Sequence, residues 1–150
     1  MFCIGIISKD IELINELISM NNKVIIITKN NVNKYLNKKI DLLVIEKKIL
    51  KNKELELLCN NSNYILLEDN VNLNVKLKNK VNIITFGFNH KSTVTISSIN
   101  NENIIICIQR NIKSLRNINI EPQEMIIEKT DKYNINTDII KKIIQEILEK

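Results

Sequence analysis

Glycine is scarce in this 150-residue chain, which contains only Gly5 and Gly87. A loop that cradles phosphate needs several glycines, because consecutive backbone N–H groups must approach the anion closely. Neither the P-loop spacing nor the dinucleotide-binding fingerprint occurs, and Ile7-Ser8-Lys9-Asp10 follows the first apolar run, where such a turn is expected. The sequence therefore argues against ATP hydrolysis by a P-loop mechanism and against ordinary Rossmann-type NAD binding.

Histidine, arginine and aromatic residues are also rare. His90 is the only histidine, so a His-based metal cluster cannot be built, and no metal ligands are assigned. The net charge of +5 comes almost entirely from lysine, since Arg110 and Arg116 are the only arginines. Aromatic residues make up 4% of the chain, too few for base stacking to be expected. A nucleic-acid partner is therefore not expected.

Isoleucine, asparagine and lysine form about half of the residues, a bias typical of A/T-rich codons.

The sequence contains neither a cysteine framework nor a long apolar run. Cys3, Cys59 and Cys107 are far apart and odd in number, which indicates buried free thiols rather than disulfides, and no catalytic role is assigned to them. No signal peptide is visible, and no apolar run approaches the roughly 20 residues that span a bilayer. We expect a cytoplasmic location without membrane association.

The first part of the chain, residues 1–88, alternates between short apolar runs and amphipathic segments. The runs at 2–7, 24–28, 41–46, 64–67 and 81–86 predict strands, and 10–18, 32–39 and 51–60 predict helices. Continuous apolar strands separated by helices are typical of a parallel sheet that is covered on both faces. The Asn-rich residues 70–80 predict a mobile loop. We therefore expect an α/β fold with a mainly parallel sheet and flanking helices.

The second part, residues 89–150, has a different pattern. Strand-like runs at 93–99 and 104–109 are joined by Asn100-Asn101-Glu102-Asn103, which predicts an antiparallel hairpin. Further extended segments are expected at 118–120 and 125–128, on either side of Pro122. A closing helix is predicted with Thr137 as its N-cap and an apolar stripe facing the core. The whole chain is expected to form a single domain, an α/β part followed by this antiparallel extension and C-terminal helix.

A polar segment after the strand that ends at Gly87 is the best candidate ligand site. It consists of Asn89, His90, Lys91, Ser92 and Thr93. The carboxyl ends of strands in an α/β sheet are where ligands usually bind. The alternative is a surface loop that leads into the hairpin. Glu68-Asp69, at the end of an earlier strand, is a second and weaker candidate that could hold a cation or merely be solvated.

Two short motifs resemble the central domain of Mur ligases. Leu67-Glu68-Asp69-Asn70 resembles the acidic motif that ends a late strand there, and Thr85-Phe86-Gly87 resembles the element that leads into antiparallel structure. The match covers residues 63–110. The pattern is also similar to that of small proteins of A/T-rich bacteria that carry Gly-Phe-Asn, then Gln-Arg and Glu-Pro-Gln-Glu. The resemblance implies a reduced relative that lacks the P-loop and the ligase chemistry.

A second resemblance concerns residues 41–46, which are similar to the third strand of a response-regulator receiver, with Glu46 where the phosphorylated Asp would stand.

The main hypothesis is a non-catalytic binding or regulatory module, a degenerate Mur-ligase-like domain. The alternatives are a small enzyme or a nucleotide or UDP-sugar binder with a site at residues 87–93, and a degenerate receiver-like signalling module. No cofactor is assigned. A protein, a nucleotide or a cell-wall precursor is the partner or ligand to test.

Overall fold

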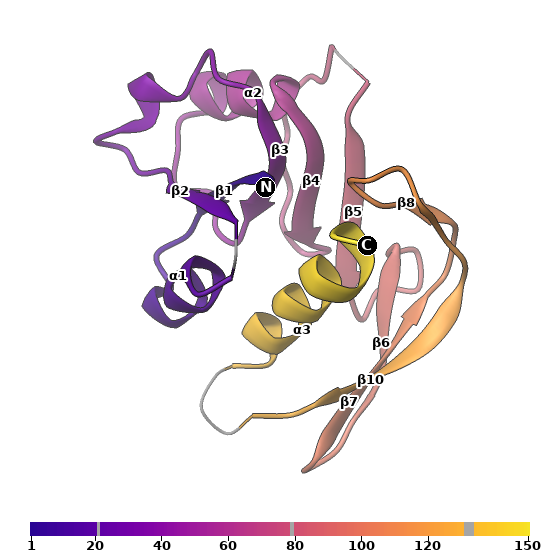
Figure 1. The fold of residues 1–150 in the computed structure, drawn as a ribbon. Coiled ribbons are helices and arrows are strands. Elements are labelled where there is room, and N and C mark those ends of the chain that lie inside the picture. Colours follow the sequence, from indigo (N-terminus) through magenta and orange to yellow (C-terminus); the bar gives the residue numbers. More distant parts are fainter. Residues whose placement is uncertain (21, 79, 131–133) are drawn as a thin grey trace. The chain divides into compact units, whose positions relative to one another are not determined.

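The computed structural model describes residues 1–20, 22–78, 80–130 and 134–150 of the chain. It divides into two compact units, Met1–Thr85 and Phe86–Lys150 (Figure 1). Parallel strands and helices build the first unit, whereas antiparallel strands and a C-terminal helix dominate the second. The predicted α/β class is confirmed, together with its antiparallel extension and its closing helix.

The first unit is built on parallel strands in the order β2-β1-β3-β4. Gly5 lies opposite Ile25 on one side of β1 and opposite Leu43 on the other. The apolar runs are buried on both faces of these strands, as a parallel sheet covered by helices requires. The strands are β1 (Cys3–Ile7), β2 (Lys23–Ile26), β3 (Ile40–Ile45) and β4 (Ser62–Glu68).

The helices α1 (Ile11–Ile18) and α2 (Asn52–Asn60) lie on opposite faces of these strands (Figure 1). Asp10 caps α1, because its carboxylate accepts hydrogen bonds from the backbone N–H of Glu12 and Leu13, at 3.0 and 3.2 Å. Leu13 and Leu17 form the buried side of α1. The apolar residues at the other helical positions do not reach the core: Ile11 is 71% exposed and Ile18 is 50% exposed.

The prediction of a helix over residues 32–39 is wrong, because only one 3₁₀ turn forms there, η1 (Val32–Lys34). The side chain of Asn31 fixes the chain before this turn. It accepts a hydrogen bond from the backbone N–H of Thr28 at 2.7 Å and donates one to the carbonyl of Ile26 at 2.8 Å. Val32 is the buried anchor of the turn. A polar side chain that satisfies backbone groups in this way stabilises a turn in place of a helix.

The mobile loop predicted for residues 70–80 is instead packed over the core across its described part. Its side chains alternate, and Val71, Leu73, Val75 and Leu77 lie against the core of the first unit. Asn60 holds this segment to α2, since its side chain donates to the carbonyl of Lys76 at 3.1 Å and accepts from the N–H of Lys78 at 2.6 Å. The core cluster consists of Ile7, Ile25, Ile27, Val32, Ile40, Leu43, Ile45, Leu50, Leu55, Leu58, Cys59, Ile65 and Leu67.

The second unit contains the predicted hairpin. Strands β6 (Val94–Ile99) and β7 (Asn103–Ile108) pair antiparallel, and the N–H of Asn100 donates to the carbonyl of Asn103 at 3.0 Å in the turn. A register shift between Ile96 and Ser98 marks a β-bulge in β6. Strand β10 (Gln123–Glu128) pairs antiparallel with the other side of β7. Strands β8 (Ile112–Lys113) and β9 (Asn119–Ile120) form a separate short pair.

Strand β5 (Asn82–Gly87) crosses from the first unit into the second, and its end pairs with the start of β6. This pair is parallel, with Phe86 opposite Val94 and Gly87 opposite Thr95. The first antiparallel pair is therefore β6 with β7, the hairpin that the sequence predicts. Parallel neighbours usually need a long crossover connection. Residues 88–93 are enough here because only the end of β5 pairs with the start of β6, so the chain does not have to return along the length of β5.

The C-terminal helix α3 (Ile135–Ile143) continues into a π-helical turn, η2 (Ile144–Leu148). The predicted apolar stripe is buried throughout, at Ile139, Ile140, Ile143, Ile144, Ile147 and Leu148. The expected N-cap Thr137 is wrong, since Asn134 caps the helix and accepts from the Thr137 N–H at 2.9 Å and from its hydroxyl at 3.2 Å. Over the described residues, no helix is long and apolar enough to cross a membrane.

Candidate functional site

The predicted ligand segment, residues 89–93, connects β5 to β6 within the second unit. Asn89, His90 and Lys91 are exposed, whereas Ser92 and Thr93 are buried, with 3% and 6% of their surface exposed. The segment closes as a turn: the Ser92 N–H donates to the Asn89 carbonyl at 3.0 Å, and the Lys91 N–H donates to the Asn89 carboxamide oxygen at 2.9 Å. Asn89 thus acts as a turn residue in an Asx motif.

The residues just after β7 hold this turn in place. The Gln109 side chain donates to the carbonyls of His90 and Ser92, at 2.8 and 3.0 Å, and its backbone N–H donates to the Thr93 carbonyl at 3.0 Å. The Arg110 guanidinium donates to the Lys91 carbonyl. The Gln-Arg pair noted in the sequence therefore has a structural role, because it satisfies four successive carbonyls. The geometry favours a rigid surface turn, and a ligand at residues 89–93 stays a hypothesis.

The carboxyl ends of the parallel strands in the first unit offer a different site. The strand order β2-β1-β3-β4 reverses direction between β1 and β3, and ligands of open α/β sheets bind outside the strand ends at such a reversal. Ser8 follows β1 and Glu46 follows β3, and the Ser8 hydroxyl donates to the Glu46 carboxylate at 3.0 Å. Ser8 also accepts from the Asp10 N–H at 2.8 Å, which links this pair to the start of α1.

A polar pocket of about 460 Å³ lies next to this pair, at the ends of β3 and β4. The Lys48 ammonium reaches across to the Asn72 carbonyl, at 3.4 Å. The pocket thus combines cationic lysines, acidic side chains and amides, the groups that recognise phosphates, hydroxyls and base edges. Its lining residues are Glu46, Lys47, Lys48, Glu68, Asn70, Val71 and Asn72.

The sequence pointed to only part of this pocket. The sequence identifies Glu68, which forms an acidic pair with Asp69 after a strand, and Glu46, which ends the receiver-like strand. Lys47 and Lys48 carried no signal, because lysine is common along the whole chain. The partner of Glu46 across the strand ends was also missed, since Ser8 lies 38 residues away from it in the sequence.

A second pocket of the first unit lies between the loop after β2 and the start of α2. It has a volume of about 490 Å³ and is lined by Lys29, Asn33, Ile49, Leu50, Lys51 and Glu54. Its lining includes the apolar side chains of Ile49 and Leu50, and the Glu54 carboxylate accepts a hydrogen bond from the Lys51 N–H at 3.3 Å. This pocket also lies at the carboxyl side of the strands, because Lys29 follows β2 and Ile49 follows β3.

The three cysteines are free thiols that differ in burial. Cys59 is fully buried in α2, and this burial, together with the nearby Glu56 carboxylate, raises the pKa of its thiol to about 12. Cys3 and Cys107 are only partly buried, so the prediction that both are core thiols is wrong in degree. Across the described ranges, no group of His, Cys, Asp and Glu side chains is placed to hold a metal ion.

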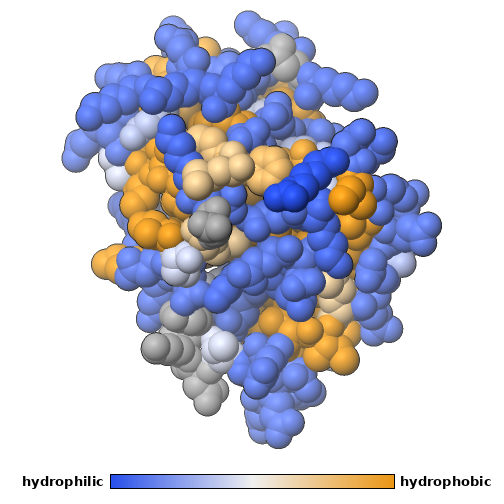
Figure 2. Space-filling model, in the orientation of Figure 1, coloured by the Kyte–Doolittle hydropathy of each residue, from blue (hydrophilic) through white to orange (hydrophobic). Residues whose placement is uncertain are grey.

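The fold and this site define an open α/β protein with a polar cleft at the carboxyl edge of its parallel strands and an antiparallel extension. Figure 2 shows mainly hydrophilic side chains on the visible face, with apolar patches between them. Comparison of the chain with protein-family models, curated proteins and solved structures gives no match.

Proposed function

We propose that this chain is a non-catalytic cytoplasmic binding or regulatory module that binds a small phosphate-bearing ligand at the carboxyl edge of its first unit. The observation that carries the proposal is the polar pocket at the ends of β3 and β4, beside the reversal of strand order. Ligands of open α/β sheets bind outside the carboxyl ends of the strands, and this pocket lies at those ends, on the β3–β4 side of the reversal. Lys47 and Lys48 supply cations for phosphate, while Glu46 and Glu68 supply acceptors for hydroxyls or base N–H groups.

The ligand class that fits this mixture is a nucleotide or a UDP-sugar. A glycine-rich loop that wraps a triphosphate is missing from the sequence, so the phosphates would be held by side chains rather than by backbone N–H groups. Such a site can bind and release a nucleotide, but it lacks the usual apparatus for activating the γ-phosphate. This is why we propose binding rather than turnover.

The Mur-ligase-like form of the proposal makes the ligand a cell-wall precursor that carries UDP. The motif Glu68-Asp69-Asn70 stands at the end of β4, and Thr85-Phe86-Gly87 stands at the end of β5. Glu68 and Asn70 also line the pocket. In this form, the chain is a reduced relative that retains recognition of the precursor and has lost the ligase reaction.

Calorimetric titration with ADP and with a UDP-sugar tests the proposal, after mass spectrometry of any small molecule that co-purifies. We expect binding that Lys47→Ala/Lys48→Ala weakens by about tenfold or more, since two charge-assisted contacts are lost. The control is Lys23→Ala/Lys39→Ala, which makes the same charge change at exposed positions on the amino side of the strands. Equal weakening by both variants, or no binding at all, would contradict the proposal.

The alternative of a small enzyme at residues 87–93 gives a different result. ATP turnover above background that Lys91→Ala or His90→Ala abolishes would replace the binding function by a catalytic one. Both side chains are exposed, so these substitutions leave the core intact. Unchanged background turnover in both variants would agree with a non-catalytic module.

A receiver-like signalling module is the second candidate, favoured by the Ser8–Glu46 contact. This contact joins the ends of β1 and β3, and Glu46 supplies a permanent carboxylate where a receiver would gain a phosphate. We expect Glu46→Gln to shift amide resonances well beyond Ser8 and Glu46 if this charge sets a signalling conformation. Shifts confined to the pocket would favour ligand binding alone.

A further inference from the structure

Strand β10 forms an open edge in the second unit. The strand order there is β10-β7-β6, and β10 pairs along its whole length with β7, from Gln123 opposite Ile108 to Glu128 opposite Asn103. No strand among the described residues pairs with its other edge. Pro122 precedes the strand, and the strand itself contains no proline that would block pairing.

The register shows which peptide groups of β10 face outward. The Lys129 N–H donates to the Glu102 carbonyl at 2.8 Å, one residue beyond the end of the strand. Hydrogen-bonding direction alternates along an antiparallel strand, so the peptide groups of Met125 and Ile127 face β7. Those of Glu124, Ile126 and Glu128 therefore point away from the sheet, each offering one N–H and one carbonyl.

The side chains of the same residues are exposed. Glu124 and Glu128 are exposed, and Ile126 is 64% exposed, whereas Ile127 on the opposite face is buried. Ile126 lies beside the partly buried Ile105 of β7 in the sheet register. The edge thus offers free peptide groups together with an acidic–apolar–acidic row of side chains. This combination is suited to the addition of a strand from a partner.

The charge pattern decides which partner fits. Antiparallel pairing of two copies centred on Ile126 would place Glu124 of each copy against Glu128 of the other. Like charges directly opposite one another destabilise a sheet, so the edge disfavours self-association in this register. A segment with basic side chains opposite both glutamates and an apolar side chain opposite Ile126 is complementary. We propose that β10 binds an extended segment of a partner protein with this basic–apolar–basic alternation.

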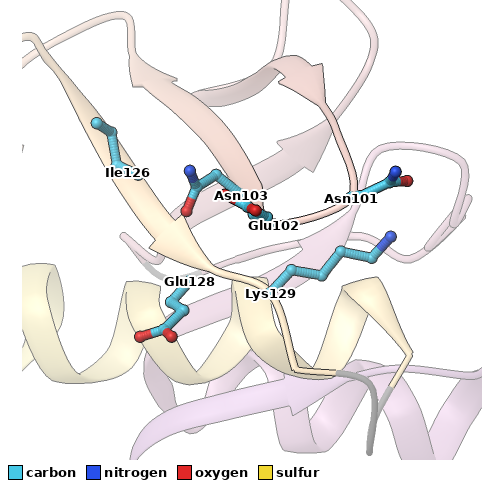
Figure 3. A pocket seen from close by; sticks show the side chains of 6 residues that line it. All are labelled: Asn101, Glu102, Asn103, Ile126, Glu128 and Lys129. Carbon is cyan, nitrogen blue, oxygen red and sulfur yellow. The ribbon is translucent and has the colours of Figure 1, made fainter.

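A pocket at the end of β10 provides space and acidic groups for a basic side chain of the partner. It has a volume of about 470 Å³ and is lined by Asn101, Glu102, Asn103, Ile126, Glu128 and Lys129 (Figure 3). Figure 3 shows the Glu128 carboxylate and the Lys129 ammonium pointing in different directions, so that Glu128 is not neutralised by its neighbour. Glu102 adds a second carboxylate near the hairpin tip. A lysine or arginine that lies opposite Glu128 can reach this pocket.

A short peptide, acetyl-Lys-Thr-Ile-Thr-Lys-amide, tests the inference by NMR titration of the isotope-labelled full chain. We expect shifts at the amides of Glu124, Ile126 and Glu128, which form new hydrogen bonds. N-methylation of the central isoleucine of the peptide removes an N–H that faces β10 and should abolish binding. N-methylation of a threonine alters an N–H that faces away and should leave binding intact. A peptide with glutamate in place of lysine should not bind.

Charge reversal in the protein provides the matching test. Glu124→Lys/Glu128→Lys should weaken binding by about tenfold or more, because two attractive pairs become repulsive. Glu12→Lys/Glu16→Lys makes the same charge change on α1 of the first unit, at an exposed and a half-buried position outside β10, and should have little effect. Equal effects of the two methylated peptides, or no shifts at millimolar peptide, would overturn the inference. A dimer through β10 in sedimentation analysis would overturn it in favour of a second copy.

Discussion

At the residue scale, Gly87 has a backbone conformation that other residues rarely adopt. Its φ angle is 150°, at the end of β5, and it is buried. A side chain there would strain the backbone by roughly 1–3 kcal/mol. We expect Gly87→Ala to lower the free energy of unfolding by about this amount in urea denaturation. Phe88→Ala is the control, since Phe88 is 71% exposed and its loss should change stability by less than about 0.5 kcal/mol.

Cys59 makes stability depend on pH in the alkaline range. Its thiol has an ordinary pKa of 9.0 when the chain is unfolded and about 12 when it is buried in the fold. Between these values the unfolded chain loses a proton that the folded chain keeps, so unfolding becomes more favourable as pH rises. The expected slope is roughly 1.4 kcal/mol per pH unit for this one group.

The measurement is urea denaturation at several pH values between 8 and 11 (roughly the range in which only the unfolded thiol ionises). Cys59→Ala should lower stability at about pH 8, because it leaves a cavity in the core, and this difference should shrink as the pH rises. It should also make the decline above pH 9.0 shallower than in the unsubstituted chain. Parallel curves for the two proteins would show that Cys59 does not carry this dependence.

At the element scale, Gln109 determines whether residues 89–93 form a fixed turn. Gln109→Ala leaves the carbonyls of His90 and Ser92 without their side-chain donor. The bond to the His90 carbonyl is exposed, so water can replace it, but an unmade hydrogen bond at the partly buried Ser92 carbonyl costs roughly 1–3 kcal/mol, and the turn should open more often. We expect faster hydrogen exchange at the Ser92 amide. Gln123→Ala removes an exposed glutamine whose side chain donates to the Glu121 carbonyl at 3.1 Å and should leave this exchange unchanged. Equal exchange in both variants would contradict the assigned role.

The elements themselves were largely predictable, because apolar runs identify buried strands without knowledge of their neighbours. Strand order was not, since the reversal between β1 and β3 depends on contacts between residues far apart in sequence. The asparagines of residues 70–80 predict a mobile loop, but the alternation of Val71, Leu73, Val75 and Leu77 within it is typical of a half-buried extended chain, which is what the described part forms. Strand β8 was missed because two residues give no period to detect.

The candidate site was also predictable only in part. Polar residues after strands could be found from sequence, and Glu46 and Glu68 both line the pocket. Which of these strand ends come together could not be inferred, because Ser8 meets Glu46 only through the pairing of β1 with β3. The 89–93 segment is a candidate from sequence because polar residues follow a strand end there. Its hydrogen bonds to Gln109 and Arg110 show how such a segment can be polar for structural reasons.

At the scale of the whole molecule, the two compact units bear on the expectation of a single domain. The core cluster of the first unit lies between Ile7 and Leu67, and further residues up to Val81 pack against it. The unit of 85 residues is longer than many domains that fold alone.

These observations lead to a test of independent folding. We expect a fragment of Met1–Thr85 to unfold cooperatively in urea, because it retains the full core cluster and the packed segment that follows β4. A fragment of residues 1–70 is the matched control. It keeps every strand from β1 to β4 but lacks Val71, Leu73, Val75 and Leu77, and it should lose cooperativity or much of its stability. If the longer fragment is unfolded, the first unit depends on residues beyond Thr85, and the chain folds as the single domain that its sequence predicts.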